Sequence, residues 1–200
     1  MFTINQATDA FIAIDCQCDF CKDGSLAVLD GDAVMPIINE LTPRFSRNRC
    51  IASQDWHINP GDHFGNPPDF VDSWPVHCMA NSAGAAFHPD LDVHSFGCII
   101  QKGMDAAAYS AFDGFTDEDV SLHDYLQAQG VERIFLGGLA TDYCVLQTAL
   151  AGRRLGYEVV VILSACRAIA APLDDGTEKT TLDAAIERMR TAGVTLVEAI

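Results

Sequence analysis

The sequence predicts an α/β protein: a three-layer α/β/α sandwich in which helices cover both faces of a mostly parallel, doubly wound central sheet. Apolar runs of strand length alternate with segments of helical periodicity along the whole chain. The runs lack polar alternation, which is typical of parallel strands buried on both faces. The 200 residues show no internal repeat, low-complexity tract or linker. We therefore expect a single domain over residues 1–200.

The first half of the chain is expected to hold three strands and one helix. The strands are predicted at 10–15, 49–53 and 98–102, and apolar residues at helical spacing predict the helix at 32–47. Between 59 and 92 the periodicity is lost, and Pro, Gly, Asn, His and aromatic residues are frequent. Loops of this length in compact domains are usually functional, so we expect region 54–92 to carry part of the site.

The second half repeats the alternation of helix and strand. Helices are predicted at 118–129, after Cys144 up to Gly156, and at 178–192, and strands at 133–136, 158–163 and 194–197. No Gly-x-Gly-x-x-Gly pattern follows the first strand, so a dinucleotide site is not expected.

Charge and composition exclude several classes of partner. The net charge of −16 disfavours nucleic acid and anionic membranes, and no apolar run reaches the length of a membrane span. With no secretory signal, the eight cysteines are expected to be free thiols, and the protein cytoplasmic. Exposed and interface apolar positions look alike in sequence, so a homo-oligomer is left open.

Cys144 stands where the strand at 133–136 gives way to a helix. Unpaired N–H groups and the helix dipole favour a negative charge at such a position, which predicts a lowered thiol pKa. The alternative is a small buried hydrophobic residue. Asp15 and Lys102 also end predicted strands. Because parallel strand ends share one edge of the sheet, we expect a nucleophile, a base and a charge stabiliser to meet there.

A second set of residues indicates a metal. Asp55 and His57 are two apart and point the same way in an extended chain, and His63 and His77 follow. One carboxylate and two or three imidazoles suit a divalent transition metal with open positions. The three remaining histidines are expected to be structural, and the cysteines at 16, 18 and 21 lack the matching cluster that a metal site would need.

The chain resembles the nicotinamidase/pyrazinamidase branch of the isochorismatase-like cysteine hydrolases over nearly its whole length. The segments that carry the resemblance are IDCQCDFC (14–21), GSLAV (24–28), DWHINPGDHF (55–64), SWPVHC (73–78), GAAFHP (84–89), KG (102–103), YSAF (109–112) and GLATDYCV (138–145). The metal motif and the Trp-Pro-x-His-Cys motif are specific to this branch, whereas the Asp/Lys/Cys set marks only the superfamily.

The resemblance implies a role for each matching residue. Asp15, Lys102 and Cys144 would be the catalytic triad, and the backbone N–H groups of Ala140 and Cys144 would form the oxyanion hole. The peptide bond from Leu139 to Ala140 would be cis. The expected metal ligands are Asp55, His57 and His77, with His63 as an additional or alternative one. The substrate would lie against Phe20, Leu26, Trp74, Tyr109, Leu139 and Tyr143.

The activity implied is hydrolysis of nicotinamide to nicotinate and ammonia through a thioester, with pyrazinamide as a second substrate and NAD salvage as the setting. The cofactor would be one divalent metal ion, Zn²⁺ first, with Fe²⁺ or Mn²⁺ as alternatives. Two other functions stay open: a related cysteine amidohydrolase for another small amide, and a non-catalytic nicotinamide-binding protein. The chain departs from the family at Cys18, where Asn is usual, and at Tyr143, where some members have His.

Overall fold

A six-stranded sheet forms the centre of the protein, in a computed structural model that describes residues 3–200. Its order is β3-β2-β1-β4-β5-β6, and every neighbouring pair is parallel. The strands are β1 (Asp9–Ile14), β2 (Cys50–Asp55), β3 (Cys98–Lys102), β4 (Arg133–Leu139), β5 (Glu158–Arg167) and β6 (Thr195–Val197). The predicted α/β class with a parallel sheet is confirmed.

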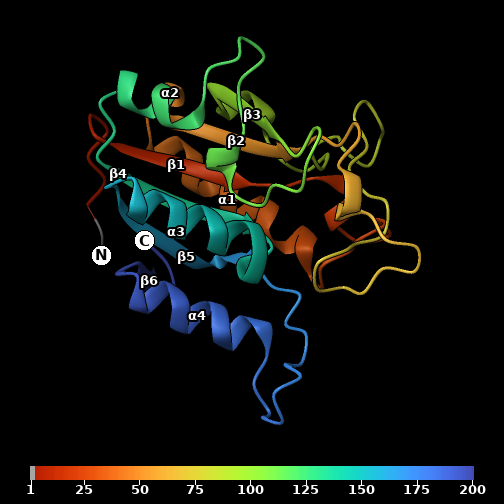
Figure 1. Ribbon diagram of the computed structural model, residues 1–200. Coiled ribbons are helices and arrows are strands. Elements are labelled where there is room, and N and C mark those ends of the chain that lie inside the picture. Colours follow the sequence, from red (N-terminus) through yellow and green to blue (C-terminus); the bar gives the residue numbers. More distant parts are fainter. Residues whose placement is uncertain (1–2) are drawn as a thin grey trace.

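Helices lie on both faces of the sheet, α3 in front and α1 behind in the view of Figure 1. They are α1 (Val34–Leu41), α2 (Leu122–Ala128), α3 (Leu146–Arg154) and α4 (Thr181–Thr191). Ile12 of β1 packs in one hydrophobic cluster with residues of α2, α3 and α4. Phe11, which points to the opposite face, packs in a second cluster with α1. Burial of both sheet faces explains the uninterrupted apolar runs of the strands.

The direction in which successive strands are added to the sheet reverses between β1 and β4. From β1 the chain adds β2 and β3 on one side, and then returns to place β4 against the other side of β1. Ligands of open α/β sheets bind beyond the carboxyl ends of the strands at such a switch point. Asp15 follows β1 directly, and Ala140 to Cys144 follow β4.

The helix expected at 32–47 is α1, which covers only Val34–Leu41 between 3₁₀ turns at Gly31–Ala33 and Thr42–Arg44, and two other helices also begin later than the sequence predicts. The helix expected from 118 begins at Leu122, because the Ser121 side chain caps it by accepting the N–H of Asp124. The helix expected from 178 begins at Thr181, where Thr180 and Asp183 form a capping box. The acidic residues before these caps are common in helices, so the sequence pattern included them, but they lie outside both helices.

The connection from β2 to β3 contains no α-helix and no strand, only 3₁₀ turns at Gly61–His63 and Val93–Ser95 and isolated bridges such as Phe64 with Trp74. Its orange and yellow segments gather at one end of the sheet in Figure 1. The long irregular loop expected here is confirmed. Among residues 3–200, no helix combines the length and apolar character needed to cross a membrane.

Candidate active site and metal centre

Asp15, Lys102 and Cys144 meet at the carboxyl edge of the sheet. The Nζ atom of Lys102 lies 2.9 Å from Oδ2 of Asp15 and 3.5 Å from Sγ of Cys144. A carboxylate oxygen of Asp15 and the sulfur of Cys144 lie within 4.8 Å of each other. All three side chains are buried. The prediction that the strand ends bring these groups together is confirmed.

Ser53 holds Asp15 in this arrangement. Its hydroxyl donates to Oδ1 of Asp15 over 2.6 Å and accepts the backbone N–H of Asp15 over 3.2 Å. Asp15 itself has a φ of 48°, a left-handed conformation that is uncommon outside glycine. The sequence argument did not single out Ser53. A polar residue near the end of an otherwise apolar buried strand was the available signal.

Burial and charge set the protonation states of the three groups. Burial lowers the pKa of Lys102, yet Asp15 and Asp55 outweigh it and hold that pKa well above its ordinary value. Lys102 is therefore an ammonium ion. Burial raises the pKa of Asp15, and the attraction of Lys102 only partly offsets it. Asp15 is thus a stronger base than an exposed carboxylate.

The expected fall in the pKa of Cys144 is wrong. Burial raises this pKa well above its ordinary value, Lys102 acts against the rise, and the two carboxylates of Asp15 and Asp55 add to it. Cys144 also lies inside a π-helical turn, Thr141–Val145, that precedes α3. It is not in the first turn of an α-helix, where the expected dipole stabilisation would be largest. The resting group is a thiol, and its proton needs an acceptor.

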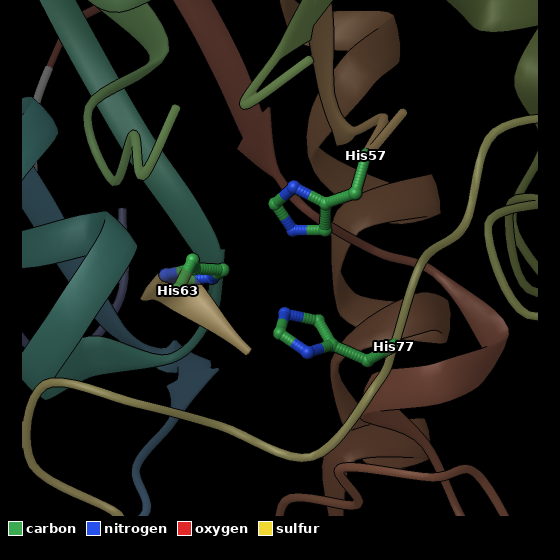
Figure 2. A group of neighbouring side chains, drawn as sticks. All are labelled: His57, His63 and His77. Atoms are coloured by element: carbon green, nitrogen blue, oxygen red, sulfur yellow. The ribbon is translucent and has the colours of Figure 1, made fainter. Parts of the chain in front are cut away.

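The second site is a cluster of three buried imidazoles, His57, His63 and His77. Their rings converge in Figure 2, and the ring centroids are 4.9 to 5.4 Å apart. Oδ2 of Asp55 faces the Nε2 atoms of His57 and His77 at 3.7 and 3.9 Å. Lys102 contacts the other carboxylate oxygen, Oδ1, at 2.5 Å. The three predicted histidines therefore form one cluster, and the predicted Asp55 faces two of them.

Two histidines of this cluster are oriented as metal ligands usually are. The Nδ1 atom of His57 contacts the backbone carbonyl oxygen of Gly103, and the Nδ1 atom of His77 contacts that of Pro75. Such contacts fix the tautomer and direct Nε2 towards the metal. The Nε2 atom of His57 and the Nδ1 atom of His63 are buried without a hydrogen-bond partner. Unpaired buried nitrogens are rare, and a bound cation would satisfy them.

Charge states agree with metal binding. Burial lowers the pKa of His63 to about 4, with help from the other two imidazoles, and lowers the pKa of His77 as well. Burial acts to raise the pKa of Asp55, but Lys102 and His57 outweigh it and hold that pKa well below its ordinary value. Neutral imidazoles and an ionised carboxylate are the forms that bind divalent metals.

A fully buried amide, Gln17, fixes the backbone beneath Asp55. Its Nε2 donates to the carbonyl oxygens of Asp55 and Ala85, and its Oε1 accepts the N–H of Asp55, each over 2.8 Å. Gln17 therefore joins the loop after β1 to the end of β2 and to the loop near Ala85. The sequence argument did not assign it a role.

One cavity opens onto both clusters. Cys144 and Ala140 line it at the catalytic cluster, and Asp55, His63 and His77 line it at the metal cluster. The rest of the lining is an aromatic and aliphatic wall, made of Phe20, Leu26, Val28, Trp74, Tyr109, Tyr143 and Ile169. Five of the six expected substrate contacts are on this wall. The sixth, Leu139, is not, because it is fully buried in the core. Val28 and Ile169 were missed: Val28 ends the GSLAV segment, from which only Leu26 was assigned to the substrate, and Ile169 lies in a loop with no motif around it.

The aromatic part of the wall is held together by specific contacts. The indole N–H of Trp74 donates to the hydroxyl of Tyr109 over 2.9 Å. The Trp74 and Tyr143 rings meet edge to face with centroids 4.9 Å apart. These contacts fix the planes of the rings that line the cavity beside Cys144, and we call this part of the cavity the slot.

The other expectations can also be placed. The Leu139–Ala140 peptide bond is cis, as the resemblance implied. All eight cysteines are free thiols. His88 lies outside the metal cluster, where it contacts Asp32 at 3.1 Å. At the unusual position 18, the thiol of Cys18 lies 3.7 Å from the carbonyl oxygen of Phe87.

Comparisons with known proteins show the family to which the chain belongs. The model of the isochorismatase domain family matches residues 9–200. The nicotinamidase/pyrazinamidase of Mycobacterium tuberculosis is 40% identical over 189 residues, which cover 94% of this chain and 97% of that protein.

Two solved structures are similar over nearly the whole chain. PnC1 of L. infantum in complex with nicotinate has a TM-score of 0.82 and 32% identity, covering 100% of this chain and 98% of that one. The pyrazinamidase of Pyrococcus horikoshii in complex with zinc has a TM-score of 0.75 and 34% identity, covering 95% and 98%. The protein therefore belongs to the isochorismatase domain family, as its motifs implied.

Proposed function

We propose that this protein is a nicotinamidase that hydrolyses nicotinamide to nicotinate and ammonia, with Cys144 as nucleophile. The observation that carries the proposal is the single cavity in which Cys144, Asp55 and His77 face one aromatic wall. A thiol supplies the nucleophile, the metal ligands supply an anchor, and the wall fits a flat heteroaromatic ring. The relative from M. tuberculosis, a nicotinamidase/pyrazinamidase, supports it.

The pyridine ring of the substrate would lie in the slot beside Trp74 and Tyr143, with Phe20 on the side of His77. The slot would hold the ring plane, so that the carboxamide carbon comes to Cys144. A ring held at a fixed angle reaches the reacting geometry at little entropic cost. Tyr143, which stands where some family members have His, places a larger aromatic ring beside the nucleophile.

Asp55, His57, His63 and His77 would hold one divalent metal ion. We propose Zn²⁺, because imidazoles and a carboxylate suit it and the P. horikoshii relative was solved in complex with zinc. The bound metal supplies a Lewis-acid contact for the ring nitrogen and so orients the substrate. The residues fit this group through their unpaired nitrogens, described above.

Asp15 would start the reaction as a general base. The thiol of Cys144 is protonated at rest, and Asp15, with its raised pKa, accepts the Sγ proton as sulfur attacks the carboxamide carbon. The ammonium group of Lys102 contacts both Asp15 and the sulfur, so it stabilises the negative charge as it moves between them.

Collapse of the tetrahedral intermediate breaks the C–N bond. Asp15 gives its proton to the leaving nitrogen, which departs as ammonia, and a thioester remains on Cys144. The backbone N–H groups of Ala140 and Cys144 would bind the oxyanion, since both residues line the cavity. Asp15, again a base, then activates the water that hydrolyses the thioester and releases nicotinate.

The proposal is tested by an ammonia-release assay on nicotinamide, pyrazinamide and a panel of aliphatic amides, run before and after metal removal by a chelator. We expect turnover of the two aromatic amides, loss of it with the chelator, and recovery with Zn²⁺. Binding of nicotinamide without ammonia release would instead make the protein a binding protein. Faster turnover of an aliphatic amide would assign another amidohydrolase activity.

A further inference from the structure

A second cavity lies behind the metal cluster, at the protein surface. We call it the acidic vestibule, defined by Asp62, His63, Asp69, Asp72 and Asp105. Four of these five residues are carboxylates, and no Lys or Arg lines the cavity. They come from two segments, the loop at 60–73 and the loop after β3, which meet here.

His63 lines both the vestibule and the active-site cavity. Its side chain is only 4% exposed, and its Nδ1 atom has no hydrogen-bond partner. The imidazole of His63 therefore separates the acidic vestibule from the position where the metal would bind. A buried nitrogen without a hydrogen-bond partner, at the base of a group of carboxylates, is suited to take over a cation from them.

The four carboxylates of the vestibule are not equivalent. Asp69 accepts the backbone N–H groups of Val71, Asp72 and Ser73 and so shapes its own loop. The side chains of Asp62, Asp72 and Asp105 are exposed and form no ion pair with any residue between 3 and 200. These three charges are uncompensated and face solvent.

The two cavities offer a hydrated cation very different surroundings. In the active-site cavity the approach to Asp55, His63 and His77 runs past an aromatic and aliphatic wall, which gives no ligand in exchange for water. The vestibule presents oxygen ligands, which can replace water molecules one at a time. A concave surface of one charge sign also raises the local concentration of counter-ions and their association rate.

We propose that the acidic vestibule is a capture site for hydrated divalent cations, from which the metal passes His63 into the centre formed with Asp55, His57 and His77. Metal and substrate then reach the centre from opposite sides of His63. The inference rests on the proposed metal centre, and it assigns a kinetic task to Asp62, Asp72 and Asp105 that the amidase reaction does not require.

The test measures uptake of Co²⁺ by metal-free protein in a stopped-flow spectrometer, following the visible absorption that Co²⁺ gains on binding imidazoles. At low ionic strength we expect the D62N/D72N/D105N variant to take up Co²⁺ about 10-fold more slowly than the unmodified protein. The difference should shrink as salt is added, because exposed charges are screened. Turnover of the fully loaded variant should match that of the unmodified protein.

The matched control is D117N/D119N/D174N, which removes the same net charge from exposed positions outside the vestibule. An equal slowing in this control, or normal uptake in the vestibule variant, would overturn the proposal. D105N alone, in a separate loop, should slow uptake about twofold if the triple variant does not fold. If the unmodified protein gains no Co²⁺ absorption, the metal centre itself is wrong, and the proposed function fails independently.

Discussion

The two halves of the candidate site are built from different kinds of structure. Asp15, Lys102 and Cys144 come from the ends of parallel strands or from the turn directly after one. His63 and His77 come from the irregular connection between β2 and β3. The reacting groups thus stand on hydrogen-bonded sheet, whereas two of the proposed metal ligands stand on loops.

The reacting groups and the proposed metal ligands are therefore held by different parts of the fold. A sheet edge holds a few side chains in one geometry, and loops can vary in sequence while the sheet stays the same. Asp55 joins the two halves, because one of its oxygens contacts Lys102 and the other faces His57 and His77. Variants of each half should therefore fail in different ways, which the following predictions use.

The largest effect is expected for Cys144→Ala. Removal of the nucleophile should lower the rate of ammonia release by more than about 10³-fold, because Cys144 is the thiol that lines the active-site cavity. Metal content, measured by elemental analysis, should stay near one ion per chain. Cys98→Ala, at a buried thiol on the edge strand, is the matched control and should keep its activity. Appreciable turnover by Cys144→Ala would remove the thiol from the mechanism.

The opposite pattern is expected for His57→Asn. Loss of a ligand should weaken metal affinity by about 10²-fold or more, since even the partners of metal ligands contribute 10- to 100-fold. Turnover should fall and recover in part at high Zn²⁺ concentration, while Cys144 remains reactive to an alkylating reagent. His94→Asn, at an exposed histidine outside the cavity, should bind metal normally. Unchanged affinity in His57→Asn would contradict the ligand assignment.

A smaller effect is expected for Ser53→Ala. Without the hydroxyl, Oδ1 of Asp15 loses its 2.6 Å hydrogen bond, and the base is held less firmly. We expect kcat to fall by roughly 10- to 100-fold with little change in KM, because substrate binding does not involve Ser53. Ser53→Thr keeps the hydroxyl and should restore most of kcat. Equal loss in both variants would show that the position matters only for packing.

The smallest effect concerns acid stability of the metal-free protein. The pKa of His63 falls from 6.5 to about 4 on folding, so the unfolded chain binds the extra proton between these values. Stability from His63 is full above pH 6.5 and is lost as the pH falls towards 4. Thermal melts across this window should show a decline that His63→Asn reduces by a few °C. An identical decline in His63→Asn would assign it to other groups.

The sequence predicts the sheet and the meeting of Asp15, Lys102 and Cys144 because parallel strand ends must share one edge. It also predicts the gathering of Asp55 with three histidines, through motif and spacing. It does not predict the raised thiol pKa of Cys144, which depends on burial and on how near two carboxylates lie in space. The sequence also does not predict the roles of Ser53 and Gln17, or the contact between Asp105 and the loop at 60–73. The reason is the same, because these contacts join segments far apart in the chain.

Lys102 is carried by β3, one of the two edge strands of the sheet. Edge strands open by local fluctuations more readily than central ones, so β3 is among the first elements to separate from a folded sheet. The lysine that orders the charges of Asp15 and Asp55 would leave with it. Catalytic competence is thereby linked to an edge strand, and exchange of the β3 amide hydrogens would report how often that strand opens.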